Sequence, residues 1–170
     1  APSTSTNGGN ITVNTTDGSF TYNPPVGFEG TDTFTYTLSN GTGLTDTGTV
    51  SITVSGMIWF INNGAASCTT IAAGCGRLNS PFSALASFNT ANVGGGSNPD
   101  NNDNIFIFES GTGYSGAVTL RTGQKLIGQD ATATLQSISG VTIPPFSSPA
   151  LPAMNSANGT ITNLTSTVTL

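Results

Sequence analysis

Histidine is absent from the 170-residue chain, and basic residues are scarce, with three Lys and Arg in total. The absence of histidine excludes a Ser–His–Asp triad, a Cys–His dyad and any His-ligated metal site. Phosphate binding requires clustered Lys and Arg, so this scarcity and a formal net charge of −5 predict no nucleic-acid partner. A continuous apolar run of about 18 residues is also missing, so we expect no insertion into a membrane.

Charged residues of either sign make up only 6% of the chain, whereas typical soluble domains contain about a quarter. Long surface helices depend on Glu, Lys, Arg and Gln, which are rare in this sequence. Thr, Val, Ile and Phe instead suit pleated surfaces, and 22 glycines provide turns. The composition therefore predicts an all-β fold.

The two cysteines, Cys68 and Cys75, enclose the stretch CTTIAAGC. We expect a disulfide, which would close a small ring and stabilise the fold by roughly 2–3 kcal/mol. Two free thiols, or a metal site completed by carboxylates, are the alternatives. A disulfide indicates an oxidising setting, so the sequence predicts an extracellular or cell-surface location. The opening stretch APSTSTNGGN lacks the basic and apolar regions of a secretion signal, so we expect a processed or partial product.

Apolar and polar residues alternate from residue 10 to residue 55, and this period of two predicts antiparallel strands with one buried face. The apolar positions fall into four such segments: Ile11 and Val13; Phe20 and Tyr22; Phe34, Tyr36 and Leu38; and Val50, Ile52 and Val54. An immunoglobulin-like sandwich needs about seven strands. We therefore expect the first half of this domain to be missing. Its open edges, near residues 11–13 and 20–22, should recruit strands from other copies or from missing parts of the same parent protein.

The stretch DGSFTYNPPVGFEGTDTFTYTLSNGTGLTDTGTVSITV, residues 17–54, resembles the C-terminal half of the cadherin-like, immunoglobulin-fold repeats of large bacterial surface proteins. Those repeats read D-G-S-F-T-Y-x-P, then G-F-x-G-x-D-x-F-x-Y, then a final T-V-x-I-x-V strand. The matching positions are Asp17, Gly18, Phe20, Tyr22, Pro24, Gly27, Phe28, Gly30, Asp32, Phe34 and Tyr36. The resemblance implies that residues 1–55 are the C-terminal part of a stalk or spacer repeat in an exported protein.

The pattern changes in the second part of the chain, where short apolar segments are separated by Gly and Asn turns. We interpret MIWFINN, NIFIF, AVTL, KLIG, ATLQSI, TITNL and TVTL as strands. One helix is expected in NSPFSALASFNTAN, with Ser80 as N-cap and Pro81 at the first position. Phe82, Leu85 and Phe88 would then share one face of it. Short strands that each bury a few aliphatic residues fit the coils of a parallel β-helix.

Residues 56–170 resemble the N-terminal entry of right-handed β-helix domains of the pectate-lyase-like type. The matching pieces are the strand IWFINN, the helix SPFSALASFN and the stretch DNIFIFESGTGYSGAVTLRTGQKLIGQ. The resemblance implies that the helix caps the first coil and that the turn GQKLIG closes a rung. It also implies about two coils within this chain, too few for a self-contained solenoid.

The loop NPDNND suggests a Ca²⁺ site. Its oxygen ligands would come from Asp100 and Asp103, with further oxygens from Asn102 and Asn104. The alternative is a solvated loop in which these side chains cap turns. We favour the alternative, because the spacings of the EF-hand and of the glycine-rich calcium repeats are both absent. No cofactor other than Ca²⁺ is expected.

Arg121 and Lys125 raise the question of catalysis, because some polysaccharide-cleaving β-helices use an Arg or Lys to abstract a proton. General acid–base catalysis needs a titrating group tuned by its neighbours, and the sequence places no acidic cluster beside these two residues. We interpret both as surface charges at turns and expect no catalytic residue in this chain. Trp59, between Ile58 and Phe60 in an apolar strand, is interpreted as a core residue rather than a sugar-stacking one.

These observations lead to a structural hypothesis with two alternatives. We expect a fragment of a large secreted or surface-anchored bacterial protein that acts in adhesion, matrix formation or filament formation. The alternatives are a polysaccharide-cleaving β-helix whose catalytic residues lie outside this chain, and a carbohydrate-binding module. The expected partners are other copies, missing parts of the same parent protein and, under the alternatives, carbohydrate.

Overall fold

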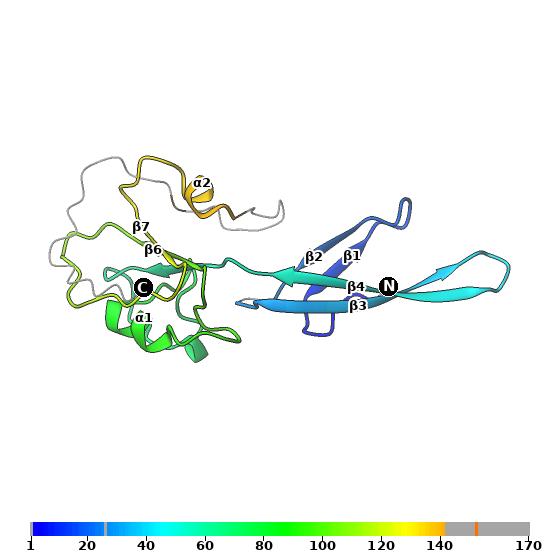
Figure 1. The fold of residues 1–170 in the computed structure, drawn as a ribbon, viewed down its shortest axis with the longest axis horizontal. Coiled ribbons are helices and arrows are strands. Elements are labelled where there is room, and N and C mark those ends of the chain that lie inside the picture. Colours follow the sequence, from blue (N-terminus) through cyan, green and yellow to red (C-terminus); the bar gives the residue numbers. More distant parts are fainter. Residues whose placement is uncertain (1, 26, 142–151, 153–170) are drawn as a thin grey trace. The chain divides into compact units, whose positions relative to one another are not determined.

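A computed structural model describes residues 2–25, 27–141 and 152 of the chain. The chain divides into two compact units, which we call unit 1 (Ala1–Ser55) and unit 2 (Gly56–Leu170). Strands make up most of the regular structure, and the helices are few and short (Figure 1). The predicted all-β class is therefore confirmed. Within the described ranges, no helix combines the length and the apolar character that crossing a bilayer requires.

Unit 1 consists of two antiparallel hairpins, each of which forms its own two-stranded sheet. β1 (Asn10–Val13) pairs with β2 (Phe20–Asn23) over the full length of both strands. β3 (Gly30–Ser39) pairs with β4 (Thr45–Val54), and this longer ladder runs without a bulge. The alternating segments predicted these four strands correctly, and their arrangement is sandwich-like.

The β3–β4 hairpin forms because the alternating pattern of its strands is joined by strong turn chemistry. Along β3 the apolar residues face inward and Phe34 is buried, whereas most of the threonines between them are exposed. In the turn, the Asn40 side-chain oxygen accepts hydrogen bonds from the N–H groups of Thr42 and Leu44, at 2.9 and 3.2 Å. Gly41 has a φ of 76°, a left-handed conformation that glycine adopts without strain.

The apolar core of unit 1 is small and covers only part of the long hairpin. Ile11 and Phe34 are its buried hydrophobic residues, and the ring of Phe20 meets that of Phe34 edge-on at 5.1 Å between centroids. β1 and β2 have four residues each, whereas β3 and β4 have ten. The short sheet leaves the distal part of the hairpin open, and the side chain of Leu38 there remains 59% exposed.

Unit 2 is built on a parallel three-stranded sheet in the order β5-β6-β7. Its strands are β5 (Ile58–Ile61), β6 (Asn104–Ile107) and β7 (Lys125–Gly128). They pair in register, so that equivalent positions of the three strands stack on one another. Each of these strands lies within a predicted strand segment.

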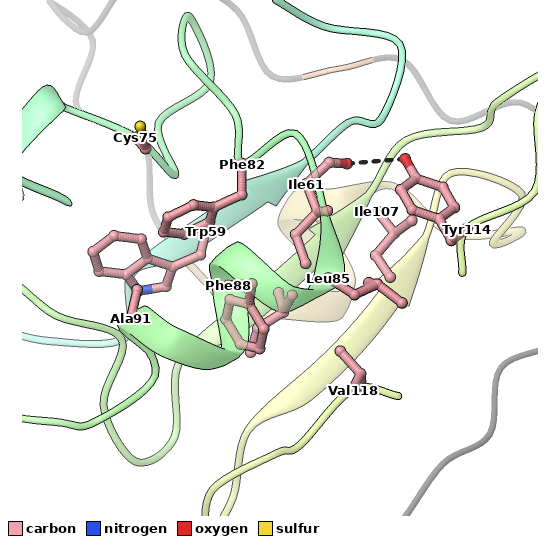
Figure 2. Packing of buried hydrophobic residues seen from close by; sticks show 11 residues of the cluster. Trp59, Ile61, Cys75, Phe82, Leu85, Phe88, Ala91, Ile107, Tyr114 and Val118 are labelled. Carbon is pink, nitrogen blue, oxygen red and sulfur yellow. Dashed lines mark hydrogen bonds between the residues drawn. The ribbon is translucent and has the colours of Figure 1, made fainter. Parts of the chain in front are cut away.

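Both faces of this sheet are buried. Trp59 and Ile105 belong to a hydrophobic cluster on one face, which the buried residues of α1 (Leu85–Ala91) help to form (Figure 2). Phe60 and Phe106 belong to a second cluster on the other face, together with the first residue of α2 (Leu135–Ser139). Strands buried on both faces have near-continuous apolar sequences, which explains why IWFI and NIFI lack the alternation seen in unit 1.

The prediction that Ser80 caps the helix, with Pro81 in its first position, is wrong. The helix α1 begins at Leu85, after Ala84 in the N-cap position. The reason lies in Phe82, which is extended beside β5: its N–H donates to Phe60 O at 2.9 Å, and its carbonyl accepts from the N–H of Asn62 at 2.8 Å. Pairing with β5 buries the Phe82 side chain completely and keeps the preceding residues out of the helix.

Two further segments differ from the strand predictions. ATLQSI contributes to α2, where the Thr134 hydroxyl accepts from the N–H of Ser137 and Gly140 ends the helix with a φ of 72°. AVTL (residues 117–120) is not a strand, because side chains of α1 replace a neighbouring strand as hydrogen-bond partners. Asn89 donates to Ala117 O at 2.8 Å. TITNL and TVTL lie outside the described residues.

Candidate functional site

Trp59 anchors the interior of unit 2 rather than a binding surface. Its side chain is fully buried and stacks on Phe82, with 6.4 Å between ring centroids (Figure 2). The guanidinium carbon of Arg77 lies 4.3 Å from the centroid of the indole ring, a cation–π geometry. The interpretation of Trp59 as a core residue is therefore confirmed.

The predicted disulfide between Cys68 and Cys75 is also confirmed, with 5.5 Å between the two Cα atoms. Cys75 is fully buried in the cluster that contains Trp59. The ring that the disulfide closes includes the 3-10 helix η1 (Ile71–Ala73). Ser80, expected to cap a helix, instead lies beside the disulfide, with its hydroxyl 3.1 Å from Cys68 Sγ.

Asp103, one of the two predicted calcium ligands, is a buried acceptor for donors of the protein itself. Its Oδ2 atom accepts a hydrogen bond from Trp59 Nε1 at 2.8 Å and another from the N–H of Asp100 at 2.7 Å. The carboxylate therefore ties the loop before β6 to the tryptophan of β5. These two hydrogen bonds hold the loop in place.

Asp100, the other predicted ligand, lies in the same loop but its carboxylate has different partners. The N–H groups of Asn101 and Gly95 donate to it at 2.7 and 3.1 Å, and Arg121 Nη2 lies 3.8 Å from its Oδ1. These donors and the positive charge of Arg121 lower the pKa of Asp100. Among the described residues, His, Cys, Asp and Glu nowhere form a group of three that could hold a metal ion. A calcium site at Asp100 and Asp103 stays a prediction.

The two basic residues of the stretch 103–130 have separate partners. Arg121 pairs with Asp100, so one carboxylate does lie beside it, which no sequence pattern indicated. Lys125, the first residue of β7, donates from Nζ to Ile138 O at 3.1 Å. Each cation thus holds a neighbouring segment of unit 2.

Three amide side chains that sequence reasoning missed join α1 to the segment before β7. Asn92 and Gln124 pair reciprocally: Asn92 Nδ2 donates to Gln124 Oε1 at 3.0 Å, and Gln124 Nε2 donates to Asn92 Oδ1 at 2.8 Å. Asn89 accepts from the N–H of Thr119 at 2.9 Å. Asn89 and Asn92 are three residues apart and so share a helix face. That spacing, next to the buried Phe88, was the signal available in the sequence.

Asp32 of unit 1, one of the positions that match the cadherin-like repeat, secures the N-terminal segment to β3. Its carboxylate accepts hydrogen bonds from the N–H of Asn7 at 2.9 Å, from Tyr22 Oη at 2.8 Å and from the hydroxyl of Ser5. Burial alone would raise the pKa of Asp32, but these hydrogen bonds outweigh burial and hold it well below its usual range. Burial and the neighbouring Asp32 raise the pKa of Tyr22 to about 12.

An apolar groove of about 530 Å³ lies in unit 1 beside the part of β3–β4 that the short sheet leaves open. We call it the unit 1 groove. Its apolar lining consists of Val13, Phe20, Phe34, Tyr36, Leu38 and Val50. Phe20 is 42% exposed although its ring contacts Phe34. The groove therefore presents hydrophobic surface to solvent.

One sheet edge that we expected to be open is covered at its start. The backbone of β1 continues its pairing with the N-terminal segment, where Ile11 N–H donates to Ser3 O at 2.9 Å and Thr4 bridges Asn10. The predicted open edge at residues 11–13 is therefore paired at Ile11, while an open edge at Val13 stays a prediction. Asp32 secures Ser5 and Asn7, which directly follow the residues that pair with β1.

The family model of the bacterial cadherin-like domain matches residues 1–56. The match supports the cadherin-like resemblance for unit 1, and 56 of the 170 residues are included in it. Neither a curated protein nor a solved structure matches the chain.

Proposed function

We propose that this chain is a structural, adhesive module of a large secreted or surface-anchored bacterial protein, with a role in adhesion, matrix formation or filament formation. The observation that carries the proposal is the match of residues 1–56 to the bacterial cadherin-like domain, a type of domain that is typically extracellular. The Cys68–Cys75 disulfide supports the same location, since disulfides persist in oxidising compartments.

Unit 2 is, in this proposal, the capped beginning of a right-handed β-helix. The in-register parallel strands β5, β6 and β7 support it, because a β-helix stacks one strand of each coil on the next. Phe82 and Gly76 satisfy backbone groups on the outer side of β5, as a cap on the first coil would. The outer side of β7 would receive the next coil.

The partners that we propose reach the module through its sheet edges. Edge strands present rows of unpaired backbone groups and pair readily with further strands. Other copies of the chain and further parts of the same parent protein are the proposed donors of such strands, and carbohydrate is a ligand that the β-helix of the parent could bind.

The module has no catalytic activity of its own in this proposal. Support comes from the absence of histidine and from the structural contacts of Arg121 and Lys125. A screen against pectate, alginate and other uronate polymers, with and without Ca²⁺, should yield no unsaturated product at its ultraviolet absorption band. Turnover that disappears in Arg121→Ala or Lys125→Ala would replace the structural reading with a polysaccharide lyase.

The test of location uses intact cells that produce the protein. Cells treated briefly with a protease that cannot enter them should lose the signal of an antibody against unit 1, while a cytosolic marker protein remains intact. An antibody signal that survives on intact cells but disappears after lysis would place the chain inside the cell and would end the proposal.

A further inference from the structure

The outer edge of β4 is the longest open strand edge in the described part of unit 1. Asn40 N–H donates to Leu44 O at 3.2 Å, and hydrogen-bonded pairs alternate along an antiparallel ladder. The backbone groups of Thr49, Ser51 and Thr53 therefore point away from β3. Within the described residues β4 pairs with no strand except β3, so these groups have no strand partner in this part of the chain.

The opposite edge of the same hairpin is protected by the chain itself. On the outer side of β3, Thr33 O accepts from the N–H of Thr6 at 2.8 Å, and Thr31 O accepts from Asn7 Nδ2 at 3.3 Å. Natural edge strands are usually protected in such ways, or by Pro, Lys or a bulge. β4 has the sequence TDTGTVSITV, with no Pro or Lys, and its ladder is regular. Only its outward Thr47 N–H is occupied, by the side chain of Asp46 at 2.8 Å.

The inner face beside this edge is apolar and incompletely covered. Val50 lines the unit 1 groove, and Ile52 and Val54 continue the same face along β4. The ring of Tyr36 lies over Gly48, and a Cβ added to Gly48 would be 2.5 Å from that ring. A strand added next to β4 would extend this apolar face and close the open side of the groove.

We propose that two copies of this chain associate through the outer edges of β4, running antiparallel about a two-fold axis at Val50. The inference rests on the proposed function, because it names which partner and which edge that function uses. In this register Thr49 of each copy forms a hydrogen-bonded pair with Ser51 of the other. The two Val50 side chains face each other on the apolar side, where non-hydrogen-bonded pairs bring side chains closest.

Symmetry favours a second copy as the occupant, and the charges of unit 1 permit it. Unit 1 carries Asp17, Glu29, Asp32 and Asp46 and no Lys or Arg, so two units must keep their acids apart. In the proposed register Asp46 lies opposite Val54 of the other copy, about eight residues or roughly 27 Å along the strands from the second Asp46. This distance exceeds the Debye length of about 8 Å at physiological ionic strength. A two-fold contact also closes on itself and leaves no further β4 edge open.

The test measures the mass of the full chain by sedimentation from about 1 μM to about 1 mM, since mass action makes a dimer depend on concentration. The key variant is Thr49→Pro, which removes an outward N–H and leaves the bonds to β3 in place. We expect the dissociation constant of the dimer to rise about thirtyfold, because the two-fold symmetry removes two hydrogen bonds at once. The matched control is Thr35→Pro, opposite Thr49 on the other edge of the hairpin, which should still dimerise.

Amide hydrogen exchange of the unaltered chain provides a readout that does not depend on a variant folding. The N–H groups of Thr49, Ser51 and Thr53 should become protected as concentration rises, while that of Thr35 should not change. A monomer at every concentration, or a dimer that protects other residues and tolerates Thr49→Pro, would overturn the inference. A monomer found on the cell surface would leave the proposed function intact, whereas a β4 dimer inside the cell would refute only the proposed function.

Discussion

Close packing around single residues limits which side chains both units can accept. At Gly76, an added Cβ would lie 2.6 Å from both Phe82 and Trp59, and the backbone there has a φ of 87°. Both aromatic side chains are fully buried, so neither can move aside without disturbing the core. Gly76 therefore fixes the approach of the disulfide loop to the sheet.

The substitution Gly76→Ala should reduce the free energy of unfolding of unit 2 by about 2–4 kcal/mol, the sum of left-handed backbone strain and overpacking. The loss is measured by urea unfolding followed through the fluorescence of Trp59, the single tryptophan. Gly74→Ala is the control, since Gly74 has a φ of 79° but open space around it. It should lose only about 1–2 kcal/mol. Equal losses in the two variants would refute the packing argument.

Asp32 controls the ionisation of its neighbour as well as the position of the N-terminal segment. The pKa of Tyr22 is raised to about 12 by burial and by Asp32. In Asp32→Asn the pKa of Tyr22 should fall toward its ordinary value of about 10, measured by NMR titration. Tyr114, whose pKa burial raises within unit 2, should not respond. An unchanged Tyr22 in the variant would show that the two side chains are not coupled.

The same residue predicts acid sensitivity of unit 1. The pKa of Asp32 is lowered in the folded state, so its stabilisation is complete above the unfolded value of about 3.9 and is lost as the pH falls below it. Below about pH 4, the N–H resonances of Asn7 and Thr33 should therefore shift or broaden as the N-terminal segment detaches. In Asp32→Asn, which cannot titrate, this change should be missing. Persistence of the same acid transition in the variant would assign it to another group.

At the scale of elements, the disulfide ring stabilises the first strand of unit 2 from outside the sheet. Gly76, next to Cys75, accepts from the N–H of Phe60 at 3.0 Å and donates to Ser80 O at 2.8 Å. Replacing both cysteines by serine should cost roughly 2–3 kcal/mol, because the unfolded chain regains the entropy of the open loop. Thermal unfolding with and without reductant measures it: reductant should destabilise the natural chain and leave the variant unchanged. A variant as stable as the oxidised chain would contradict this role.

The elements that the sequence predicted well are those with local signals. The strands of unit 1 follow from a period of two, and the turn at Asn40–Leu44 follows from its Asn and Gly residues. The start of α1 could not be read in this way, because Ser80 and Pro81 form a good local start signal. Pairing of Phe82 with β5, some twenty residues earlier in the chain, overrides that signal.

The candidate site residues show the same division. Cys68 and Cys75 are near neighbours in sequence, so their pairing was predictable. Two of the donors to Asp32 come from Ser5 and Asn7, more than twenty residues away, and no local pattern predicts them. Asp103 was recognised as a carboxylate in a loop, but its partner Trp59 is 44 residues distant. Without that contact, a buried structural acid and a calcium ligand have the same sequence signature.

Across the whole molecule, each unit satisfies its buried carboxylates with hydrogen bonds from its own residues, and few charged side chains lie on the surface. In unit 1 the buried carboxylate of Asp32 accepts hydrogen bonds from hydroxyl and amide groups. In unit 2 the buried carboxylate of Asp103 accepts one from Trp59. Such interiors suit a stable scaffold, and in the proposed function the open edges of the sheets are the surfaces that bind partners. Our proposal places this scaffold outside the cell, in an oxidising environment.

The most direct test of that claim is the redox state of Cys68 and Cys75 in protein taken from the cells that produce it. Cells are quenched in acid, free thiols are alkylated without reductant, and the intact mass of the chain is measured. We expect no alkylated cysteine before reduction and two after it, because the disulfide persists only in an oxidising compartment. Two alkylated cysteines before reduction would show that the chain resides in a reducing compartment and would contradict an extracellular location.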